Sequence, residues 1–127
     1  MDKKKKTILI IEDKLSLVEI IVSLLEKEGF LVLTAKNGLD GIKMALKNHP
    51  DVILVDIVIP DMNGLELLNR LRNNKDSWGK TAEIILLTDL DNKKIISIAD
   101  NDDCFDYLLN VNWKVEDVVA KVKGKLV

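Results

Sequence analysis

The chain has 127 residues, of which 47% are hydrophobic and 31% charged, and its formal net charge at pH 7 is −2. This composition excludes a disordered chain, and the nearly balanced charge gives no reason to expect direct binding to nucleic acid. No apolar stretch approaches the roughly 18 residues that a membrane span requires, and the first residues lack the pattern of a signal peptide.

We therefore expect one domain over residues 1–127, in which residues 1–6 form a basic N-terminal tail. The run Lys3–Lys6 has no aromatic neighbours, so a solvated tail is favoured over a binding patch. Cys104 is the only cysteine, which excludes an internal disulfide and favours a reducing compartment. The predicted location is the cytoplasm, without a membrane or nucleic-acid partner.

The first predicted elements are a strand and a helix. Thr7–Ile11 is a continuous apolar run, typical of a strand buried on both faces. Apolar residues then recur at helical spacing over Leu15–Leu25, and Ser16 with Glu19 suggests a capping box near the start of this helix. Gly29 is in the position of a helix-ending glycine.

A second strand and helix follow. Phe30–Ala35 is predicted to be a strand that ends at an Asn37-Gly38 turn. Helical spacing over Leu39–Leu46 indicates the next helix, which the sequence Asn48-His49-Pro50 ends. Val52–Asp56 is the third predicted strand.

The second half of the chain continues this alternation. Asn63 is placed to cap a helix, with Glu66 three residues later. The remaining expected elements are a helix over Leu65–Leu71, a strand over Glu83–Thr88, a helix over Lys93–Asp100, a strand over Cys104–Leu109 and a helix over Val115–Val122.

Five strands that alternate with five helices predict one fold class. Right-handed crossovers between such strands produce a parallel sheet that is covered by helices on both faces. The expected fold is therefore a doubly wound α/β domain with a five-stranded parallel sheet. The segment Phe105-Asp106-Tyr107 alternates in polarity, which indicates a half-exposed edge strand.

Three of the predicted strands end at small polar groups. Glu12 and Asp13 follow the first strand, Asp56 ends the third, and Thr88 ends the fourth. In an open α/β sheet, ligands bind beyond the carboxyl ends of the strands, so these side chains are expected to meet. Clustered carboxylates need a cation, and oxygen ligands favour Mg²⁺. Beside such a metal, Asp56 is a candidate nucleophile towards a phosphoryl group, and the product is an aspartyl phosphate.

Three motifs resemble the receiver domain of two-component response regulators, close in length to the single-domain chemotaxis regulator. The matching stretches are Ile8–Asp13, Leu54–Glu66 and Ile84–Thr88, of which the middle one is the most specific. The resemblance implies a flavodoxin-like fold with strand order 2-1-3-4-5. It also implies that a sensor histidine kinase or phosphotransfer protein donates the phosphoryl group.

The resemblance assigns roles position by position. Asp56 is the implied phosphoacceptor, and the implied Mg²⁺ ligands are Glu12, Asp13, Asp56 and the main-chain carbonyl of Val58. Thr88 is the implied switch hydroxyl and Tyr107 the switch aromatic. Phosphorylation is then expected to change the surface of the fourth helix, fifth strand and fifth helix for a downstream protein partner or a fused effector domain.

One departure from the family pattern leaves an alternative open. The family usually carries a lysine followed by proline after the switch aromatic, whereas this chain has Asn110 or Val111 at the lysine position and no proline. The alternative is a degenerate receiver that acts as a phosphorylation-independent docking module. A small hydrolase with Asp56 as nucleophile is less favoured, because no second general acid accompanies that residue. The chain is thus expected to be a signalling switch and not an enzyme.

Overall fold

The computed structural model describes residues 5–88, 93–109 and 114–126, and its centre is one parallel sheet. The strands lie in the order β2-β1-β3-β6-β7, which confirms the predicted order 2-1-3-4-5, since β6 and β7 are the fourth and fifth strands of this sheet. The five strands are β1 (Thr7–Ile11), β2 (Leu31–Ala35), β3 (Val52–Asp56), β6 (Ile84–Thr88) and β7 (Phe105–Leu109).

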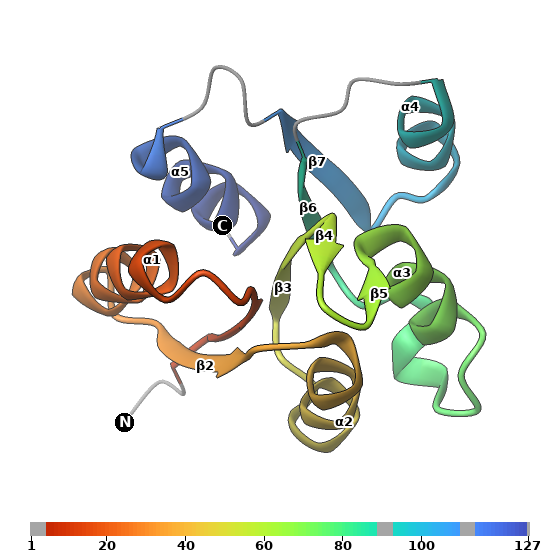
Figure 1. Ribbon diagram of the computed structural model, residues 1–127, viewed down its shortest axis with the longest axis horizontal. Helices are drawn as coiled ribbons and strands as arrows, with labels where there is room; N and C mark the ends of the chain where they lie inside the picture. The colour runs from red at the N-terminus through yellow and green to blue at the C-terminus, as the bar shows by residue number, and fades with distance from the viewer. Residues whose placement is uncertain (1–4, 89–92, 110–113, 127) are drawn as a thin grey trace.

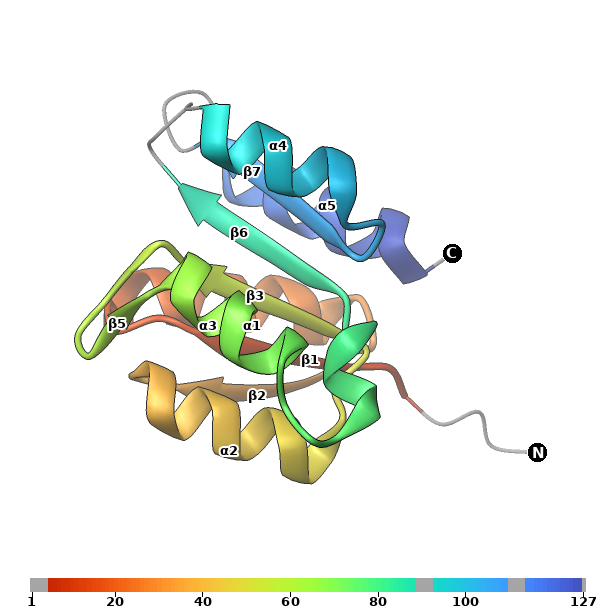
Figure 2. The same ribbon diagram turned by 90° about the vertical axis from the view of Figure 1, so that its right-hand side faces the viewer.

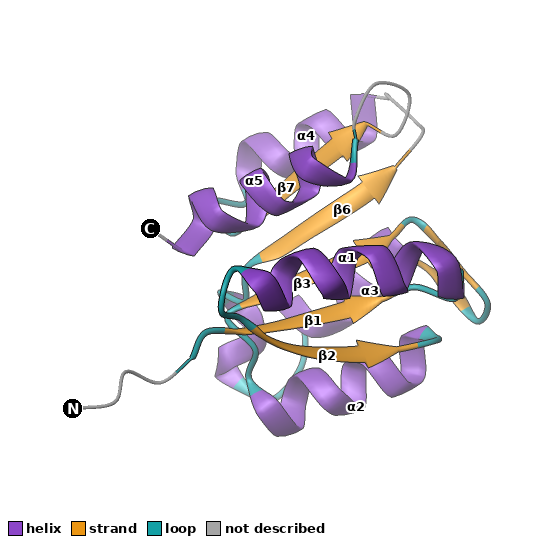
Figure 3. Ribbon diagram, turned by 90° about the vertical axis from the view of Figure 1, so that its left-hand side faces the viewer, coloured by secondary structure: helices purple, strands orange, loops and turns teal. Residues whose placement is uncertain are grey.

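Helices cover both faces of the sheet, as expected for a doubly wound fold. One face carries α1 and α5, and the other carries α2, α3 and α4 (Figures 1 and 3). The helices are α1 (Leu15–Lys27), α2 (Gly38–Asn48), α3 (Gly64–Arg72), α4 (Lys93–Asn101) and α5 (Val115–Leu126), with a short 3₁₀ helix, η1 (Ser77–Lys80).

Two apolar clusters hold these layers together, one on each face. Because side chains alternate along a strand, Ile8 and Ile10 of β1 enter the cluster under α1 and α5, while Leu9 and Ile11 enter the other. The central strands are buried on both faces, which explains their continuous apolar runs. At the edge of the sheet, β7 pairs only with β6, as its alternating polarity predicts.

The first helix is capped differently from the prediction. Lys14 is the N-cap residue of α1 and provides no side-chain hydrogen bond, so the expected capping box at Ser16 and Glu19 is wrong. The predicted glycine end is confirmed. Gly29 has φ of +92°, its N–H bonds to Glu26 O, and the N–H of Phe30 bonds to Leu25 O. These two bonds form a Schellman motif.

Two short features were not predicted from the sequence. A two-stranded antiparallel hairpin, β4 (Val58–Ile59) and β5 (Met62–Asn63), connects β3 to α3. The polar segment after α3 contains η1. Among the described residues, no helix combines the length and the apolar character needed to cross a bilayer.

Candidate functional site

The edge of the sheet at the carboxyl ends of the strands brings Glu12 and Asp56 together. In the register, Ile11 pairs with Val55, so Glu12 directly after β1 and Asp56 at the end of β3 are neighbours. The N–H of Glu12 still bonds to the carbonyl of Ala35 at 3.0 Å, which holds this residue in line with the sheet. The predicted meeting of the first and third strand ends is therefore present in the structure.

Glu12 is a buried carboxylate with an incomplete set of hydrogen bonds. Its residue is only 3% exposed, and its Oε1 has no partner among the described residues. The other oxygen, Oε2, accepts a 3.1 Å hydrogen bond from the N–H of Asp13. Burial, followed by the negative charge of Asp56, raises the pKa of Glu12 to about 7. Ionised Glu12 is thus destabilised here, and a cation beside it would relieve that cost.

Asp56 is held at the start of a tightly constrained turn. Its Oδ1 accepts a 3.1 Å hydrogen bond from the N–H of Val58. The backbone then folds back, and the N–H of Gly64 bonds to the carbonyl of Ile57 at 2.9 Å. A Cβ at position 64 would lie 2.9 Å from the carbonyl oxygen of Asp56 and would clash with Leu86. Glycine is therefore required for this close approach.

Two further side chains fix the hairpin after Asp56. Asn63 caps α3, as predicted, and accepts a 2.8 Å hydrogen bond from the N–H of Glu66. Asp61 caps α2 and accepts bonds of 2.7 and 2.9 Å from the N–H groups of Gly38 and Leu39. These two bonds hold the pKa of Asp61 below its usual value. The Asp61 contact spans 23 positions of the sequence, so no local pattern indicated it.

The metal site is only partly formed in this arrangement. Asp13 is exposed, and the described residues contain no group of three or more His, Cys, Asp or Glu side chains that could hold a metal ion. Glu12 and Asp56 nevertheless fit Mg²⁺ in their chemistry, since both supply oxygen and Oε1 of Glu12 lacks a partner. Mg²⁺ usually keeps several waters and needs only one or two carboxylates. The ligand roles of Asp13 and of the Val58 carbonyl stay predictions.

Thr88 and Tyr107 lie on neighbouring strands and share one face of the sheet. Tyr107 pairs with Leu86, two residues before Thr88, so the alternation along β6 and β7 places Tyr107 diagonally next to Thr88. Thr88 is buried, and Tyr107 is half-buried against the apolar cluster that also contains Ile95 of α4. The predicted switch pair thus lies beneath the helices that cover this face.

The two candidates for the family lysine position, Asn110 and Val111, lie outside the described residues. Lys114 is described; it precedes α5, is exposed, and its N–H bonds to Asp117 Oδ2 at 2.7 Å. Its ammonium group makes no ion pair with a described carboxylate.

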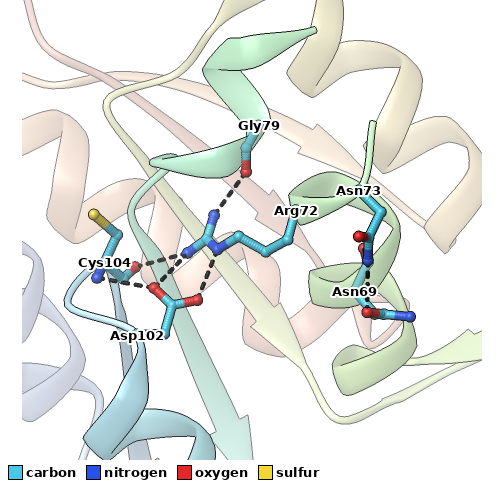
Figure 4. A network of polar contacts seen from close by, with 6 residues as sticks. All are labelled: Asn69, Arg72, Asn73, Gly79, Asp102 and Cys104. Atoms are coloured by element: carbon cyan, nitrogen blue, oxygen red, sulfur yellow. Dashed lines mark hydrogen bonds and ion pairs between the residues drawn. The ribbon is translucent and has the colours of Figure 1, made fainter. Parts of the chain in front are cut away.

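The opposite edge of the sheet holds a polar cluster that sequence reasoning missed (Figure 4). Arg72 at the end of α3 forms a bidentate pair with Asp102, at 2.7 and 3.2 Å. Its guanidinium also donates to the carbonyl of Gly79 at 2.9 Å and to that of Cys104 at 3.4 Å. Arg72 therefore joins α3, η1 and the turn before β7. Asp102 lies in the acidic segment Asp100–Asp103, in which no local pattern marks it as the partner of Arg72.

Comparison with known proteins agrees with this geometry. Residues 8–123 match the family model of the response regulator receiver domain. The chain belongs to this family. TcrX of Mycobacterium tuberculosis is 30% identical to this receiver domain over 125 residues, which are 98% of this chain and 51% of TcrX. PilH of Pseudomonas aeruginosa is 38% identical over 84 residues, which are 66% of this chain and 68% of PilH.

Solved structures support the same assignment. A two-component response regulator from Clostridium difficile superimposes with a TM-score of 0.80 at 28% sequence identity, and the match covers 96% of each chain. This receiver domain spans about half the length of TcrX. Response regulators act in two-component systems with histidine kinases and downstream effectors, and receiver domains of this family generally depend on Mg²⁺.

Proposed function

We propose that this receiver domain accepts a phosphoryl group on Asp56 in a Mg²⁺-dependent reaction. The observation that carries the proposal is the pairing of Asp56 with a buried neighbour, Glu12, whose Oε1 has no hydrogen-bond partner among the described residues. An arrangement that raises the pKa of a carboxylate without compensating it is costly for stability. It is explained if the site works with a cation and a transferred phosphoryl group.

Glu12 and Asp56 would hold the metal, with Asp13 and the main-chain carbonyl of Val58 as further ligands. When bound, Mg²⁺ would neutralise negative charge on the incoming phosphoryl group. Deprotonated Glu12 is the form that binds a cation, and its pKa of about 7 makes that form dependent on pH near neutrality. Asp13 is exposed and directly follows Glu12, so its carboxylate would be available as a further ligand.

The donor is a sensor histidine kinase or a phosphotransfer protein that carries phosphohistidine. A carboxylate oxygen of Asp56 attacks phosphorus, a P–O bond forms, and the P–N bond of the donor breaks with its electron pair passing to the histidine nitrogen. The bond from the N–H of Val58 to Asp56 Oδ1 at 3.1 Å orients the attacking carboxylate. Gly64 supports this geometry, because any side chain there would push against the Asp56 carbonyl.

The output is a change on the surface of α4, β7 and α5. Thr88, at the end of β6, would bond a phosphoryl oxygen, and Tyr107 would change rotamer with it. Their placement supports this role, since both lie on the sheet face that α4 covers, and Ile95 is the only fully described α4 residue classed as buried. Ile98 and Ala99 add only part-buried contacts to the same apolar cluster, and a helix held mainly by partly exposed residues opens at low cost.

We further infer the setting of this switch. The chain acts as one receiver domain over residues 1–127, with 1–6 as a basic tail, in the cytoplasm. It signals to a downstream protein partner or a fused effector domain and does not turn over a diffusing substrate. Of the tail, Lys5 and Lys6 are described and exposed, whereas residues 1–4 lie outside the described part.

The experiment is intact mass after incubation with Mg²⁺ and a small-molecule phosphodonor, with Asp56→Asn as control. We expect a gain of one phosphoryl group that requires Mg²⁺ and is absent in the control. A folded protein that binds Mg²⁺ but gains no mass would contradict the proposal. That result would favour the phosphorylation-independent docking module suggested by the missing lysine-proline pair.

A further inference from the structure

A groove between α2 and α3 has a lining whose charged groups are all cationic. The two helices lie side by side on one face of the sheet (Figure 2). The groove has a volume of about 700 Å³, and its charged lining residues are Lys43 of α2, Arg70 of α3 and Lys75 of the loop that follows. This concentration of positive charge is unexpected in a chain with a net charge of −2.

Two of these cations are unpaired. Lys43 and Lys75 are exposed and form no ion pair with a described carboxylate. Arg70 is bound by Glu66 at 2.7 Å, but this is an exposed pair one helical turn apart and is worth little. Arg70 also faces the carboxylate of Asp61, so the uncompensated charge of the groove comes from Lys43 and Lys75.

The other polar lining residues are Asn69, Asn73 and Asn74, whose amides offer both donors and acceptors. The side chain of Asn73 donates to the carbonyl and the side-chain oxygen of Asn69, at 2.9 and 2.8 Å. These bonds occupy the Asn69 side-chain acceptor and leave its amide nitrogen, which Figure 4 shows pointing away from the pair, without a partner among the described residues. Free amide hydrogens beside lysine ammonium groups favour carboxylate ligands.

The α2 side of the groove is apolar. Leu39 and Ile42 line it, and Leu39, in the first turn of α2, is 51% exposed. An apolar side chain left in water beside cationic groups suits a ligand that carries both an apolar side chain and negative charge.

We propose that this α2–α3 groove binds a short acidic segment of a protein partner, with carboxylates that pair with Lys43 and Lys75 and an apolar side chain on Leu39. The surface is separate from the α4, β7 and α5 surface assigned to the phosphorylation switch. The receiver domain would then hold one partner through charge at α2–α3 while its other surface responds to Asp56.

The probe is a fluorescent peptide in which glutamates alternate with leucines, titrated into the full chain at low salt. We expect saturable binding that weakens with salt, with amide shifts in NMR spectra concentrated in α2 and α3. A peptide with glutamine in place of glutamate should not bind. Inorganic polyphosphate that binds as well as the peptide would overturn the proposal in favour of a general anion surface.

Charge reversal provides the matched test. Lys43→Glu with Lys75→Glu should weaken peptide binding by about tenfold or more, because two attractive pairs become repulsive. Lys5→Glu with Lys27→Glu makes the same change in net charge at exposed lysines outside the groove and should weaken it less than about threefold. Equal losses in the two variants, or no binding by the unaltered chain, would refute the proposal.

The apolar contact is tested separately. Leu39→Ser leaves every charge in place and should weaken the leucine-containing peptide by about fivefold, with little effect on a peptide that has serine in place of leucine. Phosphorylation of Asp56 by a small-molecule donor should be unchanged in the Lys43 and Lys75 variant, so failure of the docking surface is distinguishable from failure of the phosphoacceptor.

Discussion

The two edges of the sheet differ in how their buried or partly buried carboxylates are compensated. At the amino-terminal edge, Asp102 is bound by two nitrogens of Arg72, and the same guanidinium bonds to two carbonyl oxygens. At the carboxyl-terminal edge, Glu12 is more deeply buried, and its Oε1 has no partner among the described residues. The first arrangement stabilises the fold. The second costs stability, a cost that the proposed phosphoacceptor site would account for.

The contrast is not complete, because Glu83 at the amino-terminal edge also has an oxygen without a partner among the described residues. Glu83 is only half-buried, however, whereas Glu12 is 3% exposed and lies beside Asp56. Asp102 and Glu12 therefore form the clearest contrast, which four measurements can test.

The largest expected effect on the free energy of unfolding is at the amino-terminal edge, where Arg72 binds Asp102. Arg72→Ala leaves Asp102 partly buried without its cation and should lower the free energy of unfolding by about 2 to 3 kcal/mol in urea titrations. The matched control is Arg70→Ala, which breaks the exposed pair with Glu66 and should cost about 0.5 kcal/mol or less. Similar losses in both variants would mean that the Arg72 cluster is no more important than a surface ion pair.

The second effect is an increase in the free energy of unfolding, and it concerns Glu12 at the carboxyl-terminal edge. The pKa of Glu12 is raised from 4.5 to about 7, so the folded state binds its proton more tightly than the unfolded state does. The resulting penalty is absent below pH 4.5, grows through the interval and is complete above pH 7. Glu12→Gln should therefore stabilise the fold by about 2 kcal/mol at pH 8 and hardly at all near pH 4.5.

The control for Glu12→Gln is Glu19→Gln, an exposed position on α1, which should change the free energy of unfolding by less than about 0.5 kcal/mol at either pH. Thermal unfolding monitored by circular dichroism at both pH values measures the difference. A Glu12→Gln protein that is less stable at pH 8 would show that the Glu12 carboxylate is satisfied and not strained.

The third effect concerns the metal. Because a cation binds the deprotonated carboxylate, Mg²⁺ at ten times its pH 8 Kd should stabilise the fold by about 1.4 kcal/mol at pH 8. At pH 6, where most Glu12 is protonated, the same concentration should stabilise it by only about 0.4 kcal/mol. Melting temperatures with and without Mg²⁺ measure this shift. Glu12→Gln should reduce it at pH 8. A shift that does not depend on pH or on Glu12 would place Mg²⁺ elsewhere.

The smallest effect tests how the hairpin supports Asp56. Asn63→Ala removes the cap of α3 and should cost about 1 kcal/mol of unfolding free energy. It should also slow the gain of a phosphoryl group, since the cap fixes the end of the β4–β5 hairpin, which follows Asp56. Asn63→Asp keeps an acceptor oxygen and should retain most of the stability. Unchanged phosphorylation in Asn63→Ala would separate the cap from the site.

Sequence patterns predicted the elements well where the physical cause is local. The β1 and β3 bounds agree with the expected ones, because continuous apolar runs must be buried on both faces. Gly29 and Asn63 were placed correctly from cap chemistry alone. The capping box at Ser16 failed, since Lys14 already starts the helix and leaves Ser16 inside its first turn.

The meeting of Glu12 and Asp56 could be predicted from the sequence, whereas the long-range pair of Arg72 and Asp102 could not. Glu12 and Asp56 meet because parallel strands end at a common edge, a rule that needs only the strand assignments. Arg72 with Asp102 is a contact across 30 positions of the sequence. Nothing in the neighbourhood of either residue specifies the other, so such pairs become visible only once the chain is folded.

The cap that Asp61 provides to α2 has a consequence for selectivity. The N-terminus of a helix attracts phosphate, because its free N–H groups and dipole both favour negative charge. In this protein the N–H groups of Gly38 and Leu39 are already taken by a carboxylate of the hairpin that follows Asp56. A phosphate group that approaches the N-terminus of α2 must therefore displace the Asp61 carboxylate. Because Asp61 belongs to the same chain, its effective concentration at these N–H groups does not fall when the protein is diluted.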